Sequence, residues 1–229
     1  MGAGHLSQGD VGQVADYLQP FARAIDLHGA TFKATMWNSP RTQEVRFEVL
    51  TSMMGLRAQG AVRLADVGCG PGALAGWLMR QEISPAAYLG IDALPEFIEA
   101  ARRTAPTWAA FAVGDPLADS SPLRKWQPDW IIISGTLNTM SQEQAELLLE
   151  ACFDSARVGV AFNFLSDWCS NERRLAGCGP ARRLDTQRLL DLARRHTPRV
   201  AFEQRYLDGH DAAIVAERSS SSRAARAMP

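Results

Sequence analysis

The stretch VRLADVGCGPGALAGWL, residues 62–78, limits the possible folds more than any other part of the sequence. Its apolar run ends at Asp66, and a helical pattern begins near Gly72. The alternating glycines Gly68, Gly70 and Gly72 allow a sharp turn and let a ligand lie directly against the backbone. Such a strand–turn–helix unit binds its ligand beyond the carboxyl end of the strand, where free helix N–H groups favour a carboxylate or phosphate.

Strands and helices alternate along the rest of the chain. Apolar runs predict strands at 61–68, 86–92, 109–115, 128–135, 157–165, 199–207 and 212–218. The segment WIII in the fourth of these is typical of a strand covered on both faces. The last two strands are close enough in sequence to form a hairpin, and 165–184 is a long polar connection. This order predicts an α/β fold with a doubly wound, seven-stranded, mostly parallel sheet.

The first sixty residues do not fit this alternation. We expect one helix from Asp10 to Pro20, a second over 21–29, and a third that begins at Ser39. In the third helix, one face carries Val45, Val49, Met53 and Leu56. We therefore expect a helical cover, a ligand-binding domain and a flexible tail, over 1–60, 61–218 and 219–229.

Composition and charge argue against several classes of protein. A net charge of −1 offers no basic footprint for nucleic acid. The four cysteines form no C-x-x-C pair and the histidines are scattered, so we expect neither a metal site nor a disulfide framework. No apolar run reaches the roughly 20 residues that span a bilayer, and the N-terminus has no secretory pattern. We predict a cytoplasmic protein without membrane or nucleic-acid partners and leave its oligomeric state open.

Two acidic residues narrow the choice of ligand for the glycine turn. By itself the turn suits a dinucleotide pyrophosphate or S-adenosylmethionine (SAM), although its G-x-G-x-G spacing differs from the dinucleotide pattern. Asp92 ends the second strand, where a ribose-binding carboxylate belongs. Asp115 ends the third strand, where an acceptor suits an adenine amino group. Alternatively, all three are ordinary strand–helix turns with polar ends.

The motifs LADVGCGPGALAGWL, YLGIDALPEFIEAAR and FAVGDPL resemble the first three motifs of class I SAM-dependent methyltransferases, and the resemblance extends over roughly 37–218. It implies SAM as cofactor and a last strand that inserts antiparallel into the sheet. The implied roles are the glycines for the methionyl part, Asp92 for the ribose and Asp115 for adenine N6. The full implied set is Asp66, Gly68, Cys69, Gly70, Gly72, Asp92, Ala93, Leu94, Gly114, Asp115, Pro116, Ser134 and Gly135.

The segment WNSPRTQEVRFEVL is similar to the helix that precedes the glycine motif in a bacterial subgroup of this family. The similarity makes Arg46 a candidate partner for the SAM carboxylate and Trp37 a candidate for a cation–π contact with the sulfonium. The alternatives are a solvated helix arginine and a core tryptophan. His28 stands where the subgroup usually has a tyrosine, so we assign it no role.

The sequence offers no distinctive general base. Asn138 and Asn163 follow strands that end beside the expected methyl group, so we take them, with Trp37, as candidate catalytic residues. Phe164, Asp167 and Trp168 follow in the same region. The arginines of the polar connection either form a solvated loop or attract an anionic substrate: Arg173, Arg174, Arg182 and Arg183.

Three functions fit these residues. The first is a methyltransferase that acts on an oxygen or nitrogen of a small molecule of secondary metabolism, chiefly by alignment of the reactants. The second is a methyltransferase-like SAM cyclase that forms azetidine-2-carboxylate and methylthioadenosine, with Trp37, Phe32 and Asn138 around the sulfonium and amine. The third is a SAM-binding module without catalysis.

Overall fold

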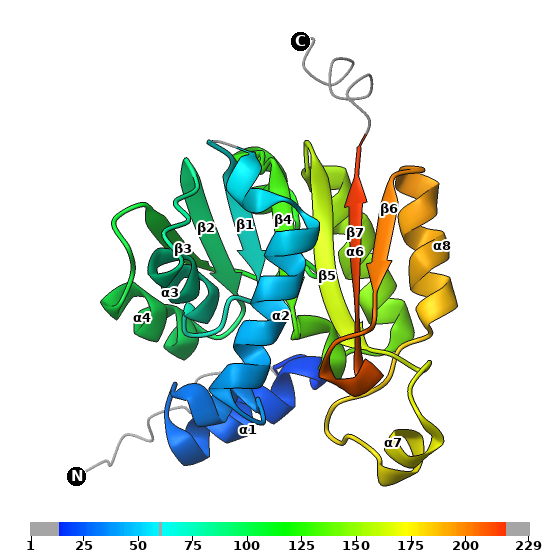
Figure 1. Ribbon diagram of the computed structural model, residues 1–229. Helices are drawn as coiled ribbons and strands as arrows, with labels where there is room; N and C mark the ends of the chain where they lie inside the picture. The colour runs from blue at the N-terminus through cyan, green and yellow to red at the C-terminus, as the bar shows by residue number, and fades with distance from the viewer. Residues whose placement is uncertain (1–13, 60, 219–229) are drawn as a thin grey trace, which may run out of the picture.

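The computed structural model describes residues 14–59 and 61–218 (Figure 1). Within these residues, seven strands form one sheet in the order β3-β2-β1-β4-β5-β7-β6. The strands are β1 (Arg63–Val67), β2 (Ala87–Asp92), β3 (Ala109–Val113), β4 (Trp130–Ser134), β5 (Gly159–Leu165), β6 (Val200–Glu203) and β7 (Asp211–Glu217). The first five are parallel, and β7 inserts antiparallel between β5 and β6, so the predicted fold class is confirmed.

Helices cover both faces of the sheet (Figure 1). They are α1 (Gln19–His28), α2 (Pro40–Met53), α3 (Ala73–Arg80), α4 (Pro95–Arg103), α5 (Ser121–Trp126), α6 (Gln142–Ser155), α7 (Asn171–Ala176) and α8 (Thr186–His196). The apolar sides of α2, α3 and α4 belong to one core cluster, and those of α5, α6 and α8 to another. Because β4 and β5 lie between the two clusters, their side chains are buried on both faces, as the WIII pattern predicts.

Short 3₁₀ turns precede or connect these elements: η1 (Asp16–Leu18), η2 (Phe32–Thr35), η3 (Leu56–Ala58), η4 (Thr136–Thr139) and η5 (Leu207–Gly209). Serine capping boxes begin α2 at Ser39 and α6 at Ser141, because each hydroxyl accepts a backbone N–H of the first turn. Figure 1 shows α1 below the carboxyl ends of the parallel strands, in blue.

The N-terminal region differs from the prediction in two ways. Pro20 lies in the first turn of α1 rather than at the end of a helix, because the missing proline N–H costs nothing there. The buried face of α2 carries Arg46, Phe47 and Leu50, whereas Val45, Val49 and Met53 are only partly buried. The predicted helix start at Asp10 and the tail at 219–229 lie outside the described residues.

The sequence patterns also missed two short helices, α5 and α7. Each spans six residues, too few to show a helical period. Helix α7 lies in the predicted polar connection. None of the helices in the described ranges is long and apolar enough to cross a membrane.

Candidate active site

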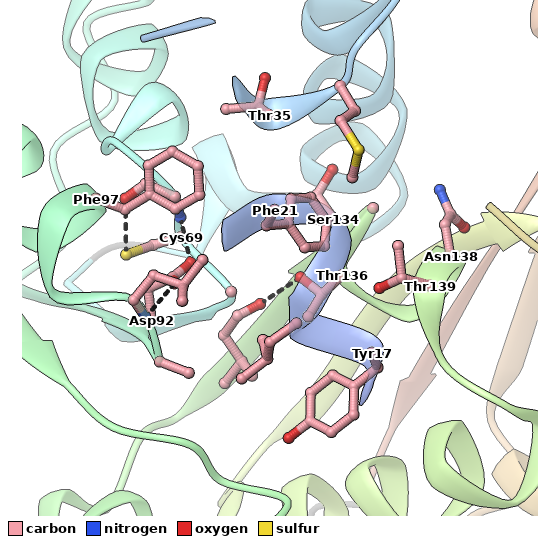
Figure 2. A pocket seen from close by; sticks show the side chains of 18 of the residues that line it. Tyr17, Phe21, Thr35, Cys69, Asp92, Phe97, Ser134, Thr136, Asn138 and Thr139 are labelled. Carbon is pink, nitrogen blue, oxygen red and sulfur yellow. Dashed lines mark hydrogen bonds between the residues drawn. The ribbon is translucent and has the colours of Figure 1, made fainter. Parts of the chain in front are cut away.

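A cavity of about 230 Å³ lies at the carboxyl ends of β1, β2, β3 and β4. Figure 2 shows Asp92 and Cys69 on one side of this cavity and Asn138 and Thr139 on the other, with Ser134 between them. Fourteen predicted site residues line it: Trp37, Asp66, Gly68, Cys69, Gly70, Asp92, Ala93, Leu94, Gly114, Asp115, Pro116, Ser134, Gly135 and Asn138. The topology therefore brings most of the predicted set to one place.

The glycine turn runs directly against the loop after β4. Gly68 has φ = 74°, and a Cβ there would lie 2.0 Å from Thr136 Oγ1. That hydroxyl donates to the carbonyl oxygen of Val67 at 3.0 Å and holds the two loops together. Only glycine fits this close approach. Gly72, just before the start of α3, does not line the cavity, because it packs toward Ala101 and Phe111.

Asp92 is held by the glycine turn that it faces. Its carboxylate accepts the N–H of Gly70 at 2.9 Å and the N–H of Leu94 at 3.0 Å. Burial raises the pKa of this carboxyl above its ordinary value, and the two backbone donors oppose that shift. Each carboxylate oxygen accepts one protein bond and keeps a lone pair for a ligand hydroxyl. A buried diol acceptor beside the apolar Ala93 and Leu94 fits the ribose of SAM.

Asp66, at the end of β1, lies beneath the same turn. It accepts the hydroxyl of Tyr88 at 2.6 Å. Burial raises its pKa to about 7, and the negative charge of Asp92 adds to the shift, whereas the Tyr88 bond opposes it. The cavity therefore has a carboxyl group that exchanges its proton near neutral pH.

Asp115 has a partner that the sequence did not reveal. Tyr17, in η1, donates its hydroxyl to Asp115 Oδ2, while Oδ1 accepts the N–H of Leu117 at 3.0 Å. Burial and this hydrogen bond raise the pKa of the tyrosine well above its ordinary value. In a second contact, the side-chain amide of Gln144 donates a hydrogen bond to Asp16 Oδ1 at 2.9 Å. The two contacts fix the start of the described chain across the cavity edge.

The structure gives Arg46 a different partner from the SAM carboxylate expected from the sequence. Its guanidinium does not line the cavity but forms a buried bidentate pair with Asp211, at 2.5 and 2.6 Å. It also donates to the carbonyl oxygen of Thr42 and lies 4.5 Å from the centroid of the Trp37 ring. Since one face of that ring already meets a cation, Trp37 offers the cavity only its remaining surface. The expected contact between Arg46 and the SAM carboxylate does not fit this arrangement.

The two candidate asparagines have different environments. Asn138 lines the cavity, and its Oδ1 accepts the N–H of Leu165 at 3.1 Å, which leaves its NH₂ group for a ligand. Asn163 is fully buried away from the cavity, and its Oδ1 accepts the N–H of Gly135 at 2.8 Å. We therefore correct its role from catalysis to support of the loop after β4.

The loop after β5 also differs from expectation. Phe164 is a core residue, Asp167 accepts the first N–H of α8, and Trp168 packs edge-on against Phe202, so none of the three lines the cavity. Arg174 and Arg183 donate to backbone carbonyls of the loop, and Arg173 pairs with Asp208. These arginines hold the loop together rather than face a substrate.

Sequence reasoning missed a second set of lining residues, which come from the covering segments, from α4 and α6 and from the loop after β4: Tyr17, Leu18, Phe21, Thr35, Met36, Gln43, Phe47, Phe97, Thr136, Thr139, Met140, Leu148 and Cys178–Ala181. They share no motif, because covering segments and loops differ among proteins of one fold. Next to the Cys178–Ala181 segment, the N–H of Arg182 donates a hydrogen bond to the carbonyl oxygen of Asn138 at 2.6 Å and anchors the segment to the loop after β4. Buried hydroxyls of Ser134 and Thr139 have no hydrogen-bond partner among the described residues.

The chain is similar to proteins of known family and structure. Residues 64–159 match a family model described as a methyltransferase domain. The magnesium protoporphyrin IX methyltransferase of Synechocystis PCC 6803, solved with bound SAH, is 14% identical with a TM-score of 0.59, over 88% of this chain and 94% of that one. The same protein has been solved with bound SAM. No curated protein sequence matches the chain.

Other solved proteins share the fold, but a larger part of each of those chains lies outside the matched region. An O-methyltransferase family protein from Burkholderia thailandensis is 17% identical with a TM-score of 0.67, over 87% of this chain and 62% of that one. The small RNA methyltransferase HEN1 is 16% identical with a TM-score of 0.60, over 77% of this chain and 25% of that one. The shared fold therefore accommodates both small and large acceptors.

Proposed function

We propose that this chain, a class I SAM-dependent methyltransferase, transfers the methyl group of SAM to an oxygen or nitrogen of a small molecule held in the covered cavity. The observation that carries the choice of a small acceptor is the cover itself. Helix α1 lies below the carboxyl ends of the parallel strands (Figure 1), and residues of η1, α1, η2 and the Cys178–Ala181 segment line the cavity. Such a cover suits an enclosed molecule better than a strand of nucleic acid, which needs an open basic groove.

The extent of the cavity favours transfer to an acceptor over cyclisation of SAM. The cofactor residues lie at the strand ends, whereas Met140, Leu148 and the Cys178–Ala181 segment line the cavity beyond them. A cyclase needs no such additional space, because both reacting atoms belong to SAM. The Tyr17 and Cys178–Ala181 contacts support a further proposal, that residues 1–60 and this segment together act as the cover.

The chain's residues would act mainly by alignment and exclusion of water. SAM supplies an electrophilic methyl group on its sulfonium. Asp92 would hold the ribose hydroxyls and Asp115 the adenine amino group. The Asn138 NH₂ group and the Thr139 hydroxyl are available to orient the acceptor atom. Met36, Met140 and Leu148 are apolar residues of the same lining and would exclude water. Cytoplasmic location and a place in secondary metabolism stay predictions.

The test is to incubate the purified protein with SAM alone and then with SAM and a set of small phenols and amines. We expect S-adenosylhomocysteine (SAH) to form only when an acceptor is present. The Asp92→Ala variant is the control for background hydrolysis and should form no product. Methylthioadenosine with a cyclic amino acid, formed from SAM alone, would instead establish the cyclase. SAM that binds but is never consumed would leave only the binding module.

A further inference from the structure

Among the described residues, the cavity has no side chain of positive charge to meet the methionyl carboxylate of SAM. Its charged lining residues within the described chain are Asp66, Asp92 and Asp115, and no lysine, arginine or histidine lines it. A carboxylate that leaves water for such a site needs strong hydrogen-bond donors, or its burial is costly. The donors must therefore be neutral groups.

Arg46 is excluded by its own pairing. Asp211 takes two of its guanidinium nitrogens and the carbonyl oxygen of Thr42 takes the third. Moving this cation into the cavity would leave Asp211 buried without a partner, and Asp211 is 0% exposed.

Gln43 lies one turn before Arg46 on the same side of α2. It lines the cavity, is 8% exposed, and its amide makes no hydrogen bond to another residue of the described chain. The amide atoms of Gln43 are not among the fully buried unpartnered atoms, so the amide is accessible from the cavity and has its hydrogen-bonding capacity available for a ligand. One turn further along α2, Phe47 also lines the cavity and meets the Trp77 ring of α3 with a centroid distance of 6.0 Å. Gln43 is therefore on the side of the cavity where α2 meets α3.

The start of α3 adds backbone donors at the same place. Gly72 caps this eight-residue helix without a side-chain hydrogen bond, and the first two helical residues, Ala73 and Leu74, line the cavity. The first N–H groups of a helix have no partner within the helix and favour an anion. An unpartnered amide and a helix N-terminus thus face the same space.

We infer that Gln43 binds the methionyl carboxylate of SAM through its amide NH₂ group, together with the N-terminus of α3, in place of the sequestered Arg46. This inference rests on the proposed use of SAM and names the residue that recognises the amino-acid end of the cofactor. Gln43 is a binding residue, so the inference concerns affinity rather than the chemistry of transfer.

The test is calorimetric binding of two nucleosides, SAH and 5′-methylthioadenosine, of which the second lacks the carboxylate and amine. Wild type is compared with Gln43→Leu, which keeps the volume, and Gln43→Glu, which places a negative charge there. Gln187→Leu is the matched control, because Gln187 is exposed on α8 and does not line the cavity. Thermal unfolding of each variant checks that it is folded.

We expect Gln43→Leu to weaken SAH binding about tenfold or more, the usual loss for a hydrogen bond to a charged group, and to leave methylthioadenosine binding within about twofold. Gln43→Glu should weaken SAH further, whereas a residue facing the ammonium would gain affinity from the same change. Equal losses for both nucleosides, or no loss for SAH, would overturn the inference and leave the proposed function intact. A wild-type protein that binds neither nucleoside would overturn both.

Discussion

Two buried carboxylates, Asp92 and Asp211, show how differently one sheet uses the same chemical group. Asp211 begins β7, and Arg46 compensates its charge with two short hydrogen bonds. Asp92 ends β2, and its donors within the described part of the chain are two backbone N–H groups. The first carboxylate has its charge neutralised within the fold. The second keeps acceptor capacity and faces the cavity, so the extent of pairing separates a structural acid from a binding one.

The largest effect should come from breaking the structural pair. Asp211→Asn leaves Arg46 buried without its counter-charge, so the free energy of unfolding should fall by about 3–5 kcal/mol in urea denaturation. The double variant Arg46→Met/Asp211→Leu replaces both charges with apolar groups and should recover most of that loss. If the single variant loses under about 1 kcal/mol, the pair does not hold α2 against β7.

Asp66 extends the comparison to a third buried carboxylate and makes stability depend on pH. Its folded-state pKa of about 7 lies above the ordinary 3.8, so the folded protein holds this proton more tightly than the unfolded chain does. Stability should therefore fall as pH rises between these values, by about 3 kcal/mol between pH 5 and 8 at most, and then level off.

The matched variant for that prediction is Asp66→Asn, which still accepts the Tyr88 hydroxyl. Its unfolding free energy, measured by denaturant titration across the same pH range, should lack the component that Asp66 contributes. Identical pH profiles for the variant and the wild type would show that Asp66 is ionised throughout.

Asp92→Asn tests the binding side of the comparison. Because a ribose diol donates both hydroxyls to a carboxylate, we expect the affinity for SAH to fall about 100-fold by calorimetry. The unfolding free energy should change by only about 1 kcal/mol, since the amide oxygen still accepts a backbone N–H. A large loss of stability with little loss of affinity would place Asp92 in the same class as Asp211.

These contrasts also explain which parts of the molecule the sequence can predict. The sheet and the residues at its strand ends follow from local signals, because apolar runs and glycine spacing are set within a few residues. The pairing of Arg46 with Asp211 depends on the antiparallel insertion of β7, which brings together residues 165 positions apart. Tyr17 and Asp115 also meet across a long separation in the sequence, 98 positions. Local patterns contain no information about such partners, and the assignment of Arg46 to SAM failed for that reason.

The smallest effect concerns the contact between the cover and the sheet. Tyr17→Phe removes the hydroxyl that meets Asp115, a hydrogen bond to a charged group in a partly exposed place, and should cost about 1 kcal/mol. The loss should be local, so trypsin should cleave after Arg23 several times faster while the global unfolding midpoint barely moves. Asp16→Asn, which affects the neighbouring contact with Gln144, is the matched variant for a change at the same turn. Because adenine would lie against Asp115, SAH should slow the cleavage in wild type and variant alike. If Tyr17→Phe leaves the cleavage rate unchanged, the Tyr17–Asp115 bond does not hold the cover, and other contacts of α1 must.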